Sequence, residues 1–226
     1  MCQRYSGGFS LNRAVIISRL LWIFPAVTIV LSMLFYSQSE HFRDWPFFVS
    51  ESDRSGPASL IFTAGFMLSG VSLSLASWMM WADKETIAQY SVENISRISG
   101  IVSGICLCGL ALFDMYEFTL IHVIFASTLF CVGCIWMFTT YKATNDKDVK
   151  ATSQRLLFIW LGGIGWLLMT VSMIAATLYH PQWLETPLDL SHVQSYVAVA
   201  AIGEYLWAIA IIGSLKSYEE IFHSTL

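Results

Sequence analysis

One acidic residue, Glu204, lies near the middle of a long apolar stretch, residues 194–217. A carboxyl group in the hydrocarbon of a bilayer costs at least ~2.5 kcal/mol, so such a residue faces protein or water rather than lipid. The small residues Ala200, Ala201 and Gly203 beside it allow another helix to come close. We therefore expect this stretch to lie inside a helix bundle. Glu204 would then either make a structural hydrogen bond or ion pair, with Arg19 as the candidate partner, or contact a ligand.

Other residues that could carry chemistry gather near one predicted membrane face. His122 and Asp114 lie close together in the chain, His192 precedes the stretch with Glu204, and Asp53 belongs to an acidic connection. Imidazoles beside carboxylates titrate near neutral pH, so this face could sense an acidic lumen, hold a cation or supply acid–base groups. The alternative is that these side chains are solvated caps of membrane helices. No known catalytic or metal motif is present, so the catalytic residues stay unknown, and we predict no metal or cofactor.

The composition is typical of a protein that crosses a membrane several times. The chain has 226 residues, of which 56% are apolar and 12% charged, and that charged share is about half of the usual one. Six runs reach spanning length, so we predict one all-α domain, 1–226, that is a six-helix membrane bundle. The predicted spans are 14–36, 58–82, 95–116, 118–141, 156–179 and 194–217. No basic stripe is present, so we expect no nucleic-acid partner, and membrane lipids or other membrane proteins are the expected partners.

The placement of basic residues predicts the orientation. Nine lysines and arginines fall on the side that holds both termini and two fall on the other side, with Arg19 set aside as intramembrane. Because cytosolic loops carry the excess of Lys and Arg, both termini should be cytosolic.

Short motifs predict helix packing and sorting. Gly100 and Gly104 form a Gly-x-x-x-Gly pattern, and Gly162 and Gly163 mark a second position at which helices can pack closely. Near the end of the chain, Tyr218 to Ile221 has the Tyr-x-x-apolar form of an endosomal or lysosomal sorting signal. The same segment could instead extend the last helix.

Several features distributed along the chain resemble one known superfamily. Arg19 stands six residues before Pro25 in the first span, and a Pro-aromatic-Val-Ser entry at 46–50 leads into an acidic Gly/Pro connection. His122 begins the fourth span, and Glu204 is followed by an aromatic residue in the sixth. On these features the chain resembles the superfamily that joins the damage-regulated autophagy modulators (DRAM), the post-GPI-attachment remodelling factor and the fibroblast growth factor receptor activating protein.

The resemblance implies different functions for different branches. The autophagy modulators are lysosomal or endosomal membrane proteins without a known cofactor, and the GPI-remodelling factor acts in the Golgi on the lipid of GPI anchors. Other relatives act at the plasma membrane. We expect a multi-pass endomembrane protein that acts on membrane trafficking or autophagy through lipids or protein partners, without being an enzyme. One alternative is a GPI-anchor lipid remodelling factor of the Golgi or ER, which would act by acyl transfer, and another is a channel or accessory subunit with Glu204 in the pore.

Overall fold

The computed structural model describes residues 7–54, 56–80, 87–144, 149–184, 188–219 and 221. These residues form six long α-helices and three short 3₁₀ helices, and no β-strand occurs among them, so the predicted all-α fold is confirmed. The long helices are α1 (Gly7–Tyr36), α2 (Gly56–Met79), α3 (Ile87–Leu112), α4 (Thr119–Thr144), α5 (Val149–Tyr179) and α6 (Gln194–Ser217). The short ones are η1 (Val49–Asp53), η2 (Pro181–Leu184) and η3 (Ser191–Val193).

All six long helices contain a stretch that is long and apolar enough to cross a membrane. Three of them begin at least seven residues before the predicted spans, because α1, α3 and α5 start at Gly7, Ile87 and Val149. Hydropathy marks the part of a helix that matches the hydrocarbon, whereas the backbone hydrogen bonds of a helix can continue into the polar region beyond it. The predicted number of spans is confirmed, and α1, α3 and α5 extend beyond their apolar parts.

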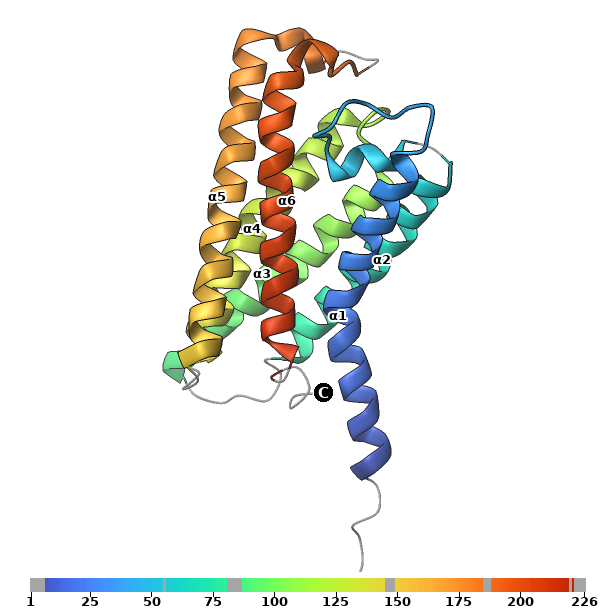
Figure 1. Cartoon of the computed structure of the whole chain (residues 1–226). Coiled ribbons are helices and arrows are strands. Elements are labelled where there is room, and N and C mark those ends of the chain that lie inside the picture. Colours follow the sequence, from blue (N-terminus) through green and yellow to red (C-terminus); the bar gives the residue numbers. More distant parts are fainter. Residues whose placement is uncertain are drawn as a thin grey trace, which may run out of the picture.

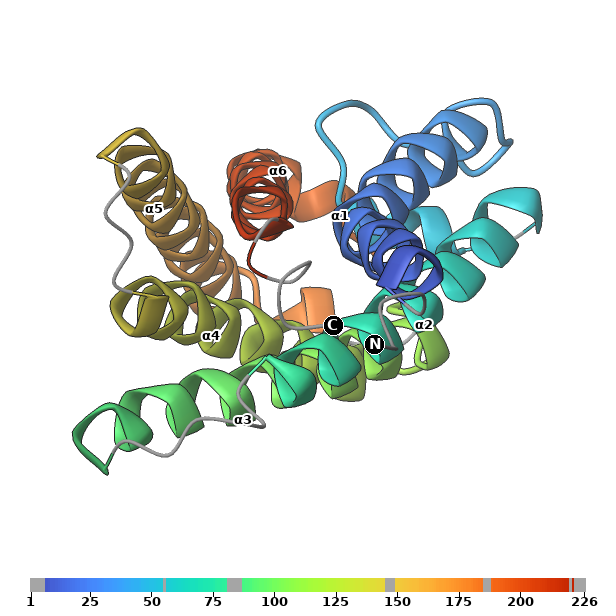
Figure 2. The same ribbon diagram turned by 90° about the horizontal axis from the view of Figure 1, so that it is seen from below.

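The helices fall into two groups that lie at an angle to each other. Helices α5 and α6 run side by side, and α1 to α4 are tilted relative to this pair (Figure 1). Seen from below, α6 lies between α5 and α1 (Figure 2). Helix α1 begins and α6 ends at the same end of the bundle, which we call the terminal end, and the opposite end, with residues 37–55, is the loop end (Figure 1). The orientation prediction makes the terminal end cytosolic.

Small residues stand where neighbouring helices approach most closely. A side chain at Gly104 would meet the backbone of Gly70 on α2, and one at Gly165 would meet the backbone of Gly203 on α6. Gly163 makes no such approach, because nothing lies within 4 Å of where its Cβ would be. The close-packing position that the sequence predicted at Gly163 is occupied by Gly165. Because helices in lipid gain stability from close van der Waals packing, α2–α3 and α5–α6 are the tightly joined pairs.

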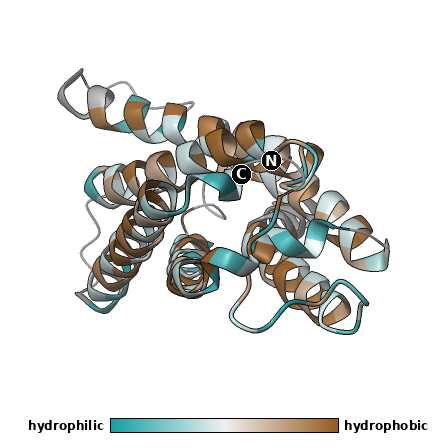
Figure 3. Ribbon diagram, turned by 90° about the horizontal axis from the view of Figure 1, so that it is seen from above, coloured by the Kyte–Doolittle hydropathy of each residue, from teal (hydrophilic) through white to brown (hydrophobic). Residues whose placement is uncertain are grey.

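Two more of the predicted packing glycines face side chains of other helices. A Cβ at Gly100 would meet Ser77 and Trp136, and one at Gly162 would meet Met137. Many of the exposed side chains on the helices are large and apolar, and hydrophilic residues are prominent in the connection after α1 (Figure 3). This distribution suits a bundle that is surrounded by lipid chains.

Candidate functional site

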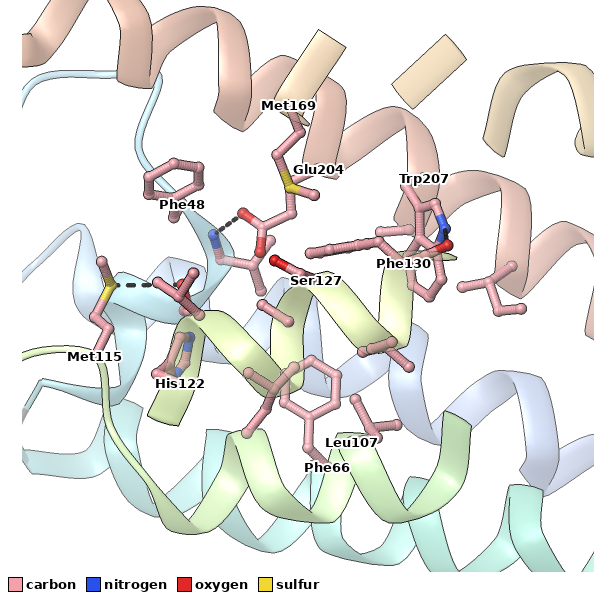
Figure 4. A pocket seen from close by; sticks show the side chains of 18 of the residues that line it. Phe48, Phe66, Leu107, Met115, His122, Ser127, Phe130, Met169, Glu204 and Trp207 are labelled. Atoms are coloured by element: carbon pink, nitrogen blue, oxygen red, sulfur yellow. Dashed lines mark hydrogen bonds between the residues drawn. The ribbon is translucent and has the colours of Figure 1, made fainter. Parts of the chain in front are cut away.

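A cavity of about 480 Å³ lies between the tilted group of helices and the α5–α6 pair. All six long helices and the connection between α1 and α2 contribute to its lining, and Figure 4 shows part of it at close range. Its polar lining residues, apart from two serines, come from the half nearer the loop end: Ser50, Thr119, His122, Ser127, Thr170, Thr177 and Glu204. Toward the terminal end the lining is apolar and includes Leu21, Leu73, Ile211 and Leu215. The cavity is thus amphipathic along its length.

Glu204 brings its carboxyl group to this cavity from α6. Its Oε2 accepts a hydrogen bond from the backbone N–H of Val49 at 2.7 Å (Figure 4). The next residue, Tyr205, donates its hydroxyl hydrogen to the carbonyl oxygen of Phe47. Two successive residues of α6 therefore hold the connection 37–55 against the cavity, and Phe48, Val49 and Ser50 become part of its lining.

The predicted partner of Glu204 is wrong. Arg19 lies near the terminal end, where its Nε donates to Glu219 Oε1 at 3.0 Å. Glu219 also accepts from the indole N–H of Trp22 at 3.0 Å. Glu204 and Glu219 are fifteen residues apart, which corresponds to a helical rise of about 22 Å. Arg19 therefore cannot reach both acids. Arg19 joins α1 to the chain just after α6 and does not belong to the cavity.

The connection 37–55 is itself built around a second buried acid, Glu51. Its side chain is fully buried and pairs with the guanidinium group of Arg43, whose Nε lies 2.8 Å from Glu51 Oε2. The backbone N–H of Phe48 donates to Glu51 Oε1 at 2.8 Å. Neither Glu51 nor Arg43 was singled out in the sequence, because nothing in the local pattern distinguishes this pair from the other charges of the connection.

His122 lies on the cavity at the start of α4, where its side chain is buried. Its Nδ1 is 2.7 Å from the carbonyl oxygen of Phe113, which can only accept, so Nδ1 carries the hydrogen of this bond. In the neutral imidazole this leaves Nε2 as a hydrogen-bond acceptor. His122 and Glu204, which lie 82 residues apart in the chain, thus line one cavity.

The other predicted polar residues lie outside the cavity lining. Asp53 accepts from Ser59 at 2.9 Å and from Thr63 at 3.2 Å, and these bonds join η1 to α2. Burial, with a smaller contribution from nearby Asp114 and against the opposing effect of the two hydroxyls, raises the pKa of Asp53 to about 6.

Asp114 and His192 have local roles at the loop end. Asp114 accepts from the backbone N–H groups of Tyr116 and Glu117, at 2.8 and 2.9 Å, and so shapes the turn between α3 and α4. His192 is exposed and lies 3.5 Å from Asp189. A hydrogen bond from Ser191 lowers the pKa of Asp189. The structure therefore brings together only Glu204 and His122 among the predicted polar residues.

The predicted sorting motif is partly buried. Tyr218 is 1% exposed and packs edge-on against Trp136 of α4, with ring centroids 6.1 Å apart. The guanidinium group of Arg155 lies over the Tyr218 ring, 4.3 Å from its centroid, and also donates to the carbonyl oxygen of Ser217 at 2.9 Å. An adaptor protein could bind this Tyr218–Ile221 motif only after Tyr218 left the bundle.

The cavity is open sideways between α4 and α5. Two of its lining residues on α4, Leu120 and Val123, and two on α5, Ile174 and Leu178, are also exposed on the outer surface. Leu120 and Leu178 are 71% and 74% exposed. Because these side chains belong to the membrane-crossing parts of their helices, the opening faces the lipid chains of the bilayer.

Within the part of the chain that the structure describes, no three His, Cys, Asp or Glu side chains lie together so that they could hold a metal ion.

Comparison with protein families produced one match that covers most of the chain. The model of the Frag1/DRAM/Sfk1/Cwh43P N-terminal domain matches residues 14–217. The match includes all the apolar spans, the connection 37–55, and both Glu204 and His122, which line the cavity. Comparisons with curated proteins and with solved structures found no match.

Proposed function

Because the chain belongs to the Frag1/DRAM/Sfk1/Cwh43P N-terminal domain family, we propose that this multi-pass membrane protein holds a membrane lipid in its cavity. Through that lipid it acts on membrane trafficking or autophagy in the endomembrane system, in lysosomes, endosomes or the Golgi, or at the plasma membrane. The observation that carries the proposal is the amphipathic lining, with Glu204 and His122 toward the loop end and leucines toward the terminal end.

The length of the cavity supports a lipid chain as the occupant. Glu204 and Leu215 both line it, and eleven residues of helical rise correspond to about 16 Å. This is about half of the ~30 Å hydrocarbon core of a bilayer, so the apolar part matches the depth of one leaflet. A lipid with its polar end near Glu204 would place its chain along the leucine-lined part.

The sideways opening between α4 and α5 supports direct exchange with the bilayer. A lipid chain that enters there passes Leu120 and Leu178 and never leaves an apolar environment. A water-soluble ligand would have no comparable route past these side chains, because the opening faces the membrane.

GPI-anchor lipid remodelling is the second candidate, and a specific observation favours it. The Glu204 carboxyl group and the His122 imidazole are two groups that can accept protons, and both line the cavity in which an acyl chain would lie. Acyl transfer needs such a base near the reacting ester. A channel has less support, because the cavity lining toward the terminal end is apolar.

The first experiment tests for the lipid itself. The full-length protein is purified in mild detergent, and its retained lipids are identified by mass spectrometry beside those of two tryptophan variants. Ala126→Trp fills the cavity, and Ala64→Trp adds the same bulk at an exposed position on α2 outside it. We expect wild type and Ala64→Trp to retain one lipid class that Ala126→Trp has lost. Equal lipid content in all three proteins would refute the proposal.

A second experiment separates the two candidates. In cells that lack the protein, autophagic flux and the fatty acids of GPI anchors are measured together. Impaired flux with normal anchors supports action on trafficking or autophagy, and abnormal anchor lipids with normal flux support the remodelling function.

A further inference from the structure

Several of the polar groups that line the cavity can accept a hydrogen bond from a ligand but have no hydrogen left to donate. The second oxygen of Glu204 makes no hydrogen bond to any residue that the structure describes, and Nε2 of neutral His122 is an acceptor. Thr119 donates its hydroxyl hydrogen to the carbonyl oxygen of Met115 at 2.8 Å, so its own oxygen can only accept from a ligand. Thr177 donates to the carbonyl oxygen of Met173 at 2.9 Å and accepts from the indole N–H of Trp183 at 3.1 Å, so it too has no hydrogen left to donate to a ligand.

The cavity also lacks positive charge among the residues described. No Lys or Arg belongs to this lining. The two arginines of the loop end are engaged elsewhere, since Arg43 pairs with Glu51 and Arg54 lies over the ring of Tyr116, 4.5 Å from its centroid. The nearby backbone N–H of Val49 is already bonded to Glu204. The lining hydroxyls that can still donate, those of Ser127 and Thr170 for example, carry no charge.

These two features select the chemistry of the ligand. A phosphate group is negatively charged and accepts hydrogen bonds, so in this lining it would meet a carboxyl group and acceptor oxygens without a cation to compensate. A hydroxyl or amine would instead donate to Glu204 or His122. From the acceptor lining and the absence of a basic side chain, we propose that the cavity binds a lipid whose inserted polar end donates hydrogen bonds and bears no phosphate. This inference rests on the proposed lipid-binding function and adds the class of lipid.

Three probes with one oleoyl chain test it on the full-length protein in detergent. Monooleoylglycerol has hydroxyl donors, oleoyl-lysophosphatidate differs from it by a phosphate, and methyl oleate has the chain without a donor. Competition against a fluorescent fatty-acyl probe gives the three affinities. We expect monooleoylglycerol to bind about ten- to a hundredfold more tightly than either other probe, the range that two hydrogen bonds of about 0.5–1.5 kcal/mol each give.

Matched variants assign this preference to Glu204. Glu204→Gln keeps an acceptor for Val49 and puts an amide N–H2 donor in place of the second carboxyl oxygen, so we expect it to reduce the preference for monooleoylglycerol over lysophosphatidate while methyl oleate binds as before. Glu117→Gln changes an exposed acid at the loop end, outside the cavity, and should behave as wild type. Unchanged binding of methyl oleate shows that the variant is folded with its cavity intact.

Each result has a separate meaning. Equal affinities for monooleoylglycerol and lysophosphatidate in the wild-type protein would overturn the inference and leave lipid binding in place. Tighter binding of lysophosphatidate would overturn it and favour a phosphate-bearing lipid, as in GPI anchors. A wild-type preference that Glu204→Gln retains would overturn the role of Glu204. If no probe binds, methyl oleate included, the proposed function itself fails.

Discussion

Removing the carboxyl group of Glu204 should loosen the connection 37–55. Its Oε2 holds the backbone N–H of Val49, a residue that is 4% exposed, at 2.7 Å. In Glu204→Ala this N–H loses its partner, and a buried donor left unsatisfied costs about 1–3 kcal/mol. For a protein of this size, 1 kcal/mol corresponds to about 2–4 °C, so we expect the unfolding temperature to fall by roughly 2–12 °C.

Two variants separate the hydrogen bond from a general effect of mutation. In Glu204→Gln the amide oxygen can still accept from Val49, so the loss should stay below about 1 kcal/mol. In Glu117→Ala an exposed side chain is truncated, and a change within about 0.5 kcal/mol is expected.

Thermal unfolding in detergent, followed by intrinsic fluorescence, measures the global effect. Limited proteolysis with trypsin measures the local one, since Arg43 and Arg54 lie in the connection, and cleavage there should be faster in Glu204→Ala than in the other two variants. Two results would refute the reasoning. One is that Glu204→Ala unfolds at the temperature of Glu117→Ala and is cleaved no faster, and the other is that it becomes more stable.

Three further predictions concern other parts of the bundle. Arg43→Met leaves Glu51 buried without its cation, so the free energy of unfolding should fall by about 3–5 kcal/mol in chemical denaturation; a loss below 1 kcal/mol would contradict the buried pair. The pKa of Asp53 is raised to about 6 from its ordinary value of 3.8, so the folded state binds a proton more tightly than the unfolded state does. The stabilisation from this proton is complete below the ordinary pKa and is lost as the pH rises through about 6. The unfolding temperature should therefore decline between pH 5 and 7 in the wild-type protein and not in Asp53→Asn. Parallel pH profiles of the two proteins would contradict this. Gly165→Leu should separate α5 from α6 and cost at least about 1–3 kcal/mol, whereas Gly163→Leu should be tolerated because nothing lies within 4 Å; equal unfolding temperatures would contradict the assigned contact.

The membrane character and the special status of Glu204 could be predicted because each depends on composition over a short range. A run of about twenty apolar residues must be a spanning helix in a bilayer, since no other open structure satisfies its backbone there. A single acid within such a run must face the interior, because lipid cannot solvate it. His122 was likewise singled out by its place at the start of a span.

The pairings were harder to predict, because the relevant residues are far apart in the chain. Arg19 was matched to Glu204 by depth, but the tilt of α1 against α6 and the position of Glu219 gave it a closer acid. Glu51 was one of several acids in the connection 37–55, and only the folded connection makes it the buried partner of Arg43. Gly163 and Gly165 differ by two residues, so only the rotation of α5 decides which of them faces α6.

The sequence by itself determined that this is a six-helix membrane protein with an acid in its interior, because burial in lipid imposes strict requirements on each segment separately. Only the tertiary structure decided that Glu204 and His122 line one amphipathic cavity and that this cavity opens between α4 and α5. It also decided that the connection between α1 and α2 is held against the cavity by the hydrogen bond from Val49 to Glu204. The physical reason is that a cavity is defined by the space between helices. That space depends on crossing angles and contacts over the whole chain, which no local pattern of residues specifies.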